Sequence, residues 1–316
     1  MIAAVSSRDR IAQIYHQPFP DLLFEAQRVH REHHDPKQVQ FCTLGNIKSG
    51  ACPEDCGYCA QSVHHNTGLK PEPLMDTDAV LEEAKAAKAG GSTRFCMGAA
   101  WREVRDGAQF DRVLEMVRQV AALDLEVCCT LGMLKPHQAQ QLKEAGLTAY
   151  NHNLDTSEEY YSKIITTRTY QDRLETIRAV SDAGISVCCG GIMGLGESID
   201  DRLSLLETLT TLNPPPESIP INALIPIDGT PLENSAPIDG IALVRMIATT
   251  RILFPSAMVR LSAGRTQMSD ELQAMCFFAG ANSIFTGAKL LTAPNPERSH
   301  DEELIVDRLG MQPKPL

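Results

Sequence analysis

The sequence predicts an α/β fold, a closed (β/α)8 barrel of the TIM type. Short apolar segments alternate with amphipathic helical patterns of about 10–20 residues along most of the 316-residue chain. Such alternation is typical of parallel strands joined by right-handed crossover helices. Eight repeats of the unit are enough to close a barrel, and chains of this length commonly form one.

A recurring helix ending supports the same fold. Four helical patterns end in Ala-Gly shortly before an apolar segment, with the glycines at positions 90, 146, 184 and 280. Glycine readily takes the left-handed conformation that ends a helix. We therefore expect each glycine to end a helix and a short loop to enter the next strand.

The elements follow in order. Residues 1–38 are expected to form a leading helical segment, and residues 297–316 a C-terminal tail whose last five residues fray. The Pro-rich segment 214–216 is expected to be a loop, so 1–316 form a single domain. An open doubly wound sheet is the alternative, although no Gly-x-Gly-x-x-Gly follows the first strand. The eight predicted strands are 39–46, 92–98, 126–131, 148–155, 186–192, 218–225, 258–263 and 283–287.

Two of the intervening segments show clear helical periodicity. In 110–124, apolar residues recur at Phe110, Val113, Leu114 and Val117, which places them on one face. In 170–183 an apolar stripe is likewise separated from most of the charged residues. Both patterns predict helices that pack one face against the sheet.

Composition excludes several classes of protein. The net charge of −11 is unfavourable for binding a phosphate backbone, so no nucleic-acid partner is expected. No apolar run is long enough to cross a membrane, and the N-terminus lacks a basic, apolar export signal, so we expect a cytoplasmic protein. Ten cysteines in such a compartment are more often metal ligands or catalytic groups than disulfides.

Three cysteines form the most informative motif. Cys52, Cys56 and Cys59 have the spacing Cys-x3-Cys-x2-Cys directly after the first predicted strand. A short loop of this kind can hold three corners of an iron–sulfur cube and leave the fourth iron open for a substrate. The alternative is a structural zinc site completed by His64 or His65.

The motif resembles that of radical S-adenosylmethionine (SAM) enzymes, including an aromatic residue, Tyr58, before the last cysteine. The resemblance implies a radical SAM barrel with a 4Fe–4S cluster whose open iron binds SAM. Cleavage of SAM in that superfamily yields a 5′-deoxyadenosyl radical.

Further cysteines lie on other predicted strands, at position 42, at position 96 and in the pairs 128–129 and 188–189. Side chains of a barrel strand alternate between lumen and exterior, so one member of each pair should face inward. Convergence from four strands favours a second metal site, whereas buried cysteines can also serve as small apolar residues. Cys276, in a predicted helix, is expected to be a core residue.

Motifs at 94–101, 150–156, 190–197, 259–265 and 290–296 resemble the biotin synthase family over about 36–296. The resemblance implies an enzyme that inserts sulfur into dethiobiotin to form biotin, with a 2Fe–2S cluster as the sulfur donor. It also implies an electron donor such as flavodoxin, and a homodimer.

The resemblance also assigns roles to individual residues. Three cysteines and an arginine would hold the 2Fe–2S cluster. Five further residues would contact SAM, and three would bind dethiobiotin. Relatives often carry a second threonine where this chain has Ala293, so one carboxylate contact is missing. Cys42 is given no ligand role, although it occupies a position near the cluster where many relatives carry serine. The cluster ligands are Cys96, Cys128, Cys188 and Arg260, the SAM contacts Tyr58, Asn153, Asp155, Arg173 and Ile192, and the substrate contacts Asn151, Asn222 and Thr292.

Spacing adds an argument independent of the family. Asn151, Asn153 and Asp155 follow one another at intervals of two on the fourth predicted strand, so we expect all three to face the lumen. Amide and carboxylate groups there suit ribose hydroxyls and a ureido ring. The remaining alternatives are another radical SAM enzyme, such as a methylornithine synthase or a hydrogenase maturase, and a non-catalytic iron–sulfur carrier.

Overall fold

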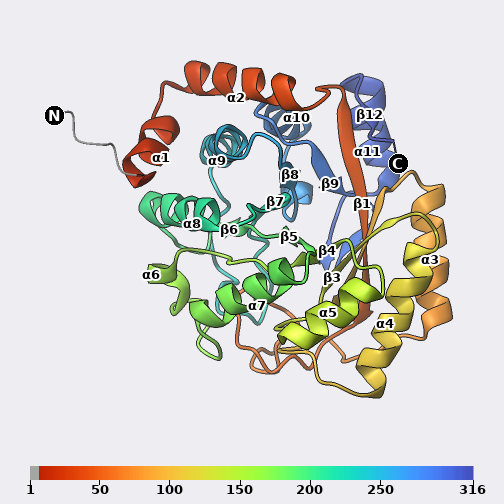
Figure 1. Ribbon diagram of the computed structural model, residues 1–316. Helices are drawn as coiled ribbons and strands as arrows, with labels where there is room; N and C mark the ends of the chain where they lie inside the picture. Colours follow the sequence, from red (N-terminus) through yellow and green to blue (C-terminus); the bar gives the residue numbers. More distant parts are fainter. Residues whose placement is uncertain (1–6, 316) are drawn as a thin grey trace.

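The predicted barrel is confirmed. In the computed structural model, which describes residues 7–315, parallel strands surround one axis and helices cover them (Figure 1). The first strand pairs with the second on one side and with the last on the other, which closes the sheet. The strands are β1 (Gln38–Lys48), β2 (Arg94–Ala99), β3 (Glu126–Thr130), β4 (Ala149–Asn151), β5 (Ser186–Cys188), β6 (Gly191–Met193), β7 (Ser218–Ala223), β8 (Met258–Leu261) and β9 (Ser283–Phe285).

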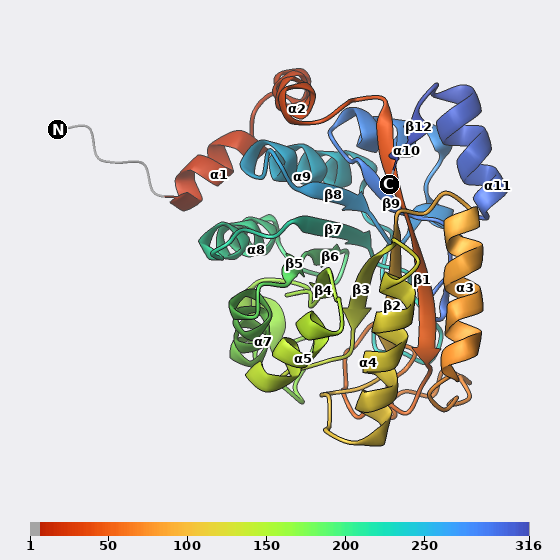
Figure 2. The same ribbon diagram turned by 45° about the vertical axis from the view of Figure 1, so that its right-hand side comes forward.

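The helices lie outside the sheet, as Figure 2 shows most clearly for α3, α4 and α9. In α4 the buried residues include Phe110, Val113, Leu114 and Val117, which are the residues of the predicted apolar stripe. The helices are α1 (Ser7–Tyr15), α2 (Phe19–His33), α3 (Thr77–Ala89), α4 (Ala108–Ala121), α5 (Pro136–Glu144), α6 (Glu158–Tyr161), α7 (Tyr170–Asp182), α8 (Ile199–Thr211), α9 (Gly240–Leu253), α10 (Asp270–Phe278) and α11 (Arg298–Asp301).

The helix-ending glycines behave as expected at three of the four positions. Gly146, Gly184 and Gly280 have positive φ values of 100°, 71° and 107°. At the first ending, Gly90 has a φ of −78°, and the next residue, Gly91, takes the left-handed conformation with a φ of 75°. A second consecutive glycine lets the chain reverse one residue later.

Two predicted strands differ from the observed ones. The fourth, expected over 148–155, ends at Asn151. The fifth, expected over 186–192, divides into β5 and β6 at Gly190. A Cβ atom on Gly190 would lie 1.9 Å from the carbonyl oxygen of Pro220 in β7, so the break brings two backbones into contact that no larger residue allows.

The C-terminal tail is ordered as far as Pro315, so the prediction that its last five residues fray is wrong for residues 312–315, while Leu316 lies outside the described residues. After α11, a π-helical segment, η2 (Glu302–Arg308), leads to β12 (Gln312–Pro313). β12 pairs in parallel with the start of β1, and the Gln312 amide donates to the Lys37 carbonyl at 2.7 Å. The tail thus satisfies backbone groups of β1 that β9 does not reach.

Candidate active site and cluster-binding cavity

One cavity of about 320 Å³ extends from the cysteine loop into the barrel. Its wall includes side chains from β2, β3, β7 and β8 and from the loops that follow the strands. The carboxyl ends of barrel strands are where TIM-type enzymes place their active sites. The cavity is also lined by the hairpin of β10 (Lys289–Leu290) and β11 (Ala293–Pro294).

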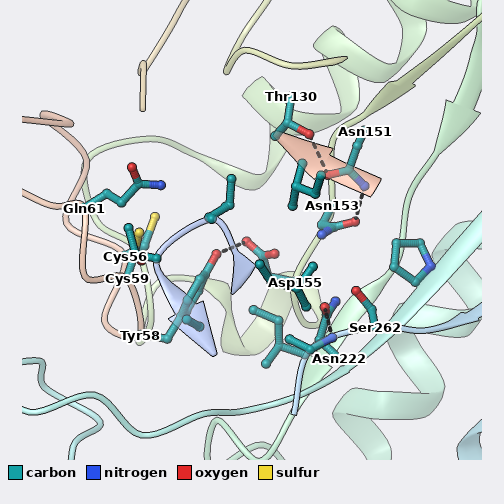
Figure 3. Close-up of a pocket in the computed structure, with 18 of the residues that line it drawn as sticks. Cys56, Tyr58, Cys59, Gln61, Thr130, Asn151, Asn153, Asp155, Asn222 and Ser262 are labelled. Carbon is teal, nitrogen blue, oxygen red and sulfur yellow. Dashed lines mark hydrogen bonds between the residues drawn. The ribbon is translucent and has the colours of Figure 1, made fainter. Parts of the chain in front are cut away.

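Cys52, Cys56 and Cys59 all border the cavity, and Figure 3 shows the sulfurs of the last two side by side. Burial raises the pKa of Cys56 to about 11 and, together with the neighbouring Cys56 thiol, that of Cys59 to about 12. These thiols therefore stay protonated at neutral pH unless a metal displaces the protons. Within residues 7–315, no three Cys, His, Asp or Glu side chains converge as the ligands of a single metal ion would.

The two histidines considered for a zinc site contact the backbone of the loop. His65 Nε2 lies 3.0 Å from the Cys56 carbonyl oxygen, and His64 Nε2 lies 3.2 Å from that of Pro53. Both rings thus support the loop from its side, and their hydrogen bonds do not favour the zinc alternative.

Asp155 contacts two other residues assigned to SAM, Tyr58 and Arg173. Its Oδ2 accepts a hydrogen bond from the Tyr58 hydroxyl at 2.9 Å (Figure 3). The same oxygen pairs with Arg173 Nη2 at 2.5 Å. Arg173 projects from α7 and also donates to the Tyr161 hydroxyl at 2.9 Å. Asp155 has a φ of 69°, a conformation that aspartate tolerates better than most residues.

Asn151, Asn153 and Asp155 all line the cavity, as expected, but strand alternation is not the whole reason. Because β4 ends at Asn151, the following residues are positioned by contacts with the next strands. Asn151 Nδ2 donates to Asn153 Oδ1 at 3.1 Å, and that oxygen also accepts from the Gly190 amide at 3.1 Å. Such bonds hold the polar side chains in place before any ligand binds.

Three other predicted contacts also reach the cavity. Asn222, on β7, spans two strands by donating to the Gly191 carbonyl at 3.0 Å and accepting from the Ala263 amide at 3.2 Å. Ile192 on β6 and Thr292 between β10 and β11 line the same space. Ala293 lies beside Thr292 on the wall and offers no hydroxyl.

Deeper in the barrel lies a group of thiols. Cys96 and Cys128 are paired across β2 and β3, and both line the cavity. Cys42, Cys96 and Cys128 belong to a small buried cluster inside the barrel. The outward-facing Cys129 and Cys189 pack instead into the larger core between sheet and helices, which agrees with the parity predicted for the two pairs.

Arg260 extends among these thiols and is 1% exposed. Its Nη1 lies 3.9 Å from the Cys188 sulfur, its Nη2 lies 3.3 Å from the Cys42 sulfur, and its Nε donates to the Ser283 hydroxyl at 2.9 Å. It forms no ion pair with a carboxylate of the described residues. A buried guanidinium without a carboxylate requires another source of negative charge, which thiolates or an anionic cluster would supply.

The floor of the barrel is closed by a different arginine. Arg94, two residues before Cys96 on β2, pairs with Glu126 at 2.8 Å and with Glu217 at 3.1 Å. Gln40 donates to the same Glu126 carboxylate and accepts from Ser283, which links the floor to Arg260. This network separates the thiols from the solvent below the barrel.

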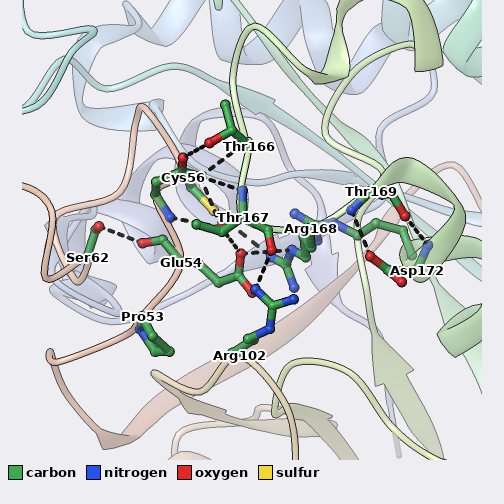
Figure 4. Close-up of polar contacts among 12 residues, drawn as sticks. Pro53, Glu54, Cys56, Ser62, Arg102, Thr166, Thr167, Arg168, Thr169 and Asp172 are labelled. Atoms are coloured by element: carbon green, nitrogen blue, oxygen red, sulfur yellow. Dashed lines mark hydrogen bonds and ion pairs between the residues drawn. The ribbon is translucent and has the colours of Figure 1, made fainter.

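A second group of charged residues was not predicted from the sequence. Glu54, inside the cysteine motif, is 2% exposed and pairs with Arg102 at 3.2 Å and with Arg168 at 3.7 Å (Figure 4). Arg168 Nη2 also lies 4.0 Å from the Cys56 sulfur. The sequence does show a glutamate between two candidate ligand cysteines, Cys52 and Cys56. It does not show the ion pairs of Glu54, because Arg102 and Arg168 are far away along the chain.

The comparisons with known proteins agree with this geometry. The Radical SAM superfamily model matches residues 46–209, and a model described as the Biotin and Thiamin Synthesis associated domain matches 220–312. A biotin synthase from Gloeobacter violaceus is 71% identical over 98% of this chain and 97% of its own. The chain belongs to the biotin synthase family. It is also an enzyme of the radical SAM superfamily.

Other biotin synthases are similar over nearly the same range. Those of Christiangramia forsetii and Flavobacterium johnsoniae are 59% and 58% identical, covering 98% and 96% of this chain and 85% and 84% of their own. The two family matches meet at the cavity, because the cysteine loop lies in the first and Arg260 in the second.

Solved structures show how widely the barrel is shared. A methylornithine synthase and the hydrogenase maturase HydG of Carboxydothermus hydrogenoformans each align with a TM-score of 0.81 at 17% identity. The alignments cover 99% and 98% of this chain, and 95% and 76% of theirs. At that identity the likeness concerns the fold, and it is the biotin synthase sequences that separate this chain from those two enzymes. None of the helices in residues 7–315 is both long enough and apolar enough to span a membrane.

Proposed function

We propose that this protein forms biotin by inserting sulfur into dethiobiotin. Cys52, Cys56 and Cys59 would hold a 4Fe–4S cluster that binds SAM, and a 2Fe–2S cluster would be held deeper in the barrel by Cys96, Cys128, Cys188 and Arg260. The observation that supports this is the placement of both thiol groups around one cavity. When bound, these groups supply a radical able to break an unactivated C–H bond and a source of sulfide.

The residues around Asp155 have the chemistry needed to orient SAM. The Asp155 carboxylate and the Asn153 amide can bind ribose hydroxyls, and Ile192 offers an apolar surface near the break between β5 and β6. Arg173 and Tyr58 fix the Asp155 carboxylate by direct contacts. Preorganised groups of this kind lower the cost of bringing reacting atoms into line.

Asn151 and Asn222 are proposed to bind the ureido ring of dethiobiotin, and Thr292 its carboxylate. Amide side chains offer both a donor and an acceptor, as a ureido group requires. With Ala293 next to it, Thr292 contributes the single side-chain hydroxyl of that pair of positions.

The family resemblance extends the proposal to partners and location. We propose that a reduced flavodoxin-type protein delivers electrons, that the enzyme acts as a homodimer in the cytoplasm, and that the chain functions as a single domain.

The test is an anaerobic reaction of the reconstituted protein with SAM, a reductant and dethiobiotin, followed by mass spectrometry. Biotin together with 5′-deoxyadenosine is the expected result. Deoxyadenosine without biotin would retain the radical chemistry and require another substrate. Neither product from protein with intact clusters would favour the iron–sulfur carrier.

Variants of the cysteine loop give the matched control. Cys52→Ala, Cys56→Ala and Cys59→Ala should each abolish formation of 5′-deoxyadenosine. Cys276→Ala, which removes a buried thiol on α10 away from the cavity, should retain it. Normal deoxyadenosine formation in any loop variant would refute the assignment of that ligand.

A further inference from the structure

The inside of the barrel carries one donor more than the deep cluster of the proposed function requires. In a 2Fe–2S cluster each iron binds two bridging sulfides and two protein ligands, so four protein donors suffice. Three cysteines and Arg260 fill these positions. Cys42 is a fifth donor in the same place, and its thiol is fully buried.

Cys42 reaches this place because of the barrel register. It lies on β1 between Arg94 of β2 and Phe285 of β9, and it packs with Cys96 and Cys128 in the buried cluster inside the barrel. Its sulfur also lies 3.8 Å from the Ser283 hydroxyl, which itself accepts from Arg260. Cys42 and Arg260 therefore share one polar neighbour.

The contact between Cys42 and Arg260 shows how close the two donors lie. Arg260 Nη2 donates a hydrogen bond to the Cys42 sulfur at 3.3 Å. Nη1 of the same guanidinium lies 3.9 Å from the Cys188 sulfur. The Cys42 sulfur therefore borders the position that Arg260 occupies beside the proposed ligand Cys188.

The two donors differ in how readily they bind iron. A guanidinium normally keeps its proton and then has no lone pair to offer, whereas a thiolate is a common ligand of iron–sulfur clusters. Cys42 lies inside β1, which at this position is paired with β2 on one side and β9 on the other, so the backbone there has little freedom to move. The side chain alone can turn toward a vacated position.

We propose that Cys42 is an alternative fourth ligand of the deep cluster and takes the place of Arg260 when the arginine is removed. The result is coordination by four cysteines, at positions 42, 96, 128 and 188. The incoming thiol releases one proton as it binds, and no electron is transferred. The inference rests on the proposed function, because it concerns the 2Fe–2S cluster proposed there.

The experiment compares Arg260→Met with Cys42→Ser/Arg260→Met after reconstitution with iron and sulfide. Iron and sulfide content, resonance Raman spectra, Mössbauer spectra and the reduction potential of the deep cluster are measured. Arg260→Met should retain the cluster with four-thiolate spectra and a more negative potential than wild type, because thiolate is the more electron-rich ligand. The double variant should lose the cluster or show altered spectra and potential.

The control removes a thiol from the outward face of β3, the strand that carries Cys128 on its inward face. Cys129→Ser/Arg260→Met should match Arg260→Met, since Cys129 faces the outer core. Circular dichroism and retention of the 4Fe–4S cluster show whether each variant is folded. Cys42→Ala/Arg260→Met serves as a second double variant that adds no polar group to the buried site.

Two results would overturn the inference. One is an Arg260→Met protein without the deep cluster. The other is a folded double variant whose cluster content, spectra and potential equal those of Arg260→Met. A wild-type protein that holds no deep cluster would instead overturn the proposed function, and the inference with it.

Discussion

At the scale of single residues, Asp155 compensates the charge of a buried arginine in the wall of the cavity. Its carboxylate is the acidic partner of Arg173, which is 4% exposed, and also accepts from Tyr58. Removing one member of a buried ion pair leaves the other charge without compensation, which costs more than losing a neutral hydrogen bond. Substitutions can therefore measure separately what the ion pair with Arg173 and the hydrogen bond from Tyr58 contribute to stability.

Asp155→Asn should lower the free energy of unfolding by about 3 kcal/mol, because Arg173 then remains buried without its counter-charge. Tyr58→Phe removes one hydrogen bond and should cost about 1 kcal/mol. Urea unfolding of the cluster-free protein measures both. Equal losses in the two variants would show that the ion pair does not dominate this site.

Which of two adjacent strand cysteines faces the barrel interior is also decided residue by residue. The Cys188 sulfur lies near Arg260, whereas Cys189 packs into the outer core. Cys188→Ser should therefore lose the absorbance of the 2Fe–2S cluster after reconstitution, and Cys189→Ser should keep it. The reverse pattern would contradict the assignment of Cys188 to the inside of the barrel and of Cys189 to the outer core.

At the scale of elements, the cysteine loop is held by the segment that precedes α7. Asp55 accepts hydrogen bonds from the Thr166 and Thr167 amides at 2.9 and 3.2 Å. Glu54 contacts the Thr167 hydroxyl and lies between two arginines, as Figure 4 shows. Two loops that are far apart in the sequence thus form one rigid support beneath the candidate ligands.

The break between β5 and β6 is the element whose local geometry is most constrained. Gly190→Ala would place a methyl group 1.9 Å from the Pro220 carbonyl oxygen, so one of the two backbones must move. We expect a loss of about 3 kcal/mol or more in unfolding free energy, the range of severe core overpacking.

Gly240→Ala is the matched control for this substitution. The added Cβ would meet only side-chain atoms of Leu272, at 3.1 Å or more, and a side chain can adjust. Its stability should change by less than about 1 kcal/mol. A Gly190→Ala protein as stable as this control would show that the approach to β7 can relax.

At the scale of the whole molecule, a buried cluster joins the N-terminal helices to the barrel. His30 of α2 stacks on His34 with ring centroids 5.4 Å apart, and His34 Nε2 lies 3.0 Å from Arg251 Nη1 of α9. Burial, reinforced by the nearby Arg251 charge, lowers the pKa of His30 to about 3 and that of His34 to about 4.

These pKa values predict a pH-dependent stability. In the unfolded chain both histidines titrate near pH 6.5, so between about pH 6.5 and 4 the unfolded state binds more protons than the folded state. Stability should therefore fall as the pH decreases, by about 2 kcal/mol for each histidine and about 4 kcal/mol for the pair between pH 7.5 and 5. Urea unfolding of wild type and of His30→Gln/His34→Gln at both pH values measures the difference.

The double variant should show a smaller decrease than wild type. His137→Gln, which replaces a histidine that is about half exposed beside Asp106, should keep the wild-type decrease. An unchanged decrease in the double variant would assign the effect to other groups.

Much of the fold could be predicted because its signals are local. The alternation of apolar segments with amphipathic helices gave the barrel, and Gly146, Gly184 and Gly280 end their helices in the predicted way. The boundaries of β4 and β5 and the ordered tail could not be predicted in this way. They depend on backbone contacts with Gly190, Pro220 and β1 that propensity does not encode.

By itself, the sequence determined the class of chemistry. The spacing of Cys52, Cys56 and Cys59 and the alternation within each strand decide which thiols can share a loop or face the lumen, since both are properties of neighbouring residues. Only the tertiary structure decided which remote groups meet. Cys42 and Arg260 are 218 residues apart, and Glu54 and Arg168 come together across two loops. Their contacts exist because the barrel closes and buries charges that must then be compensated.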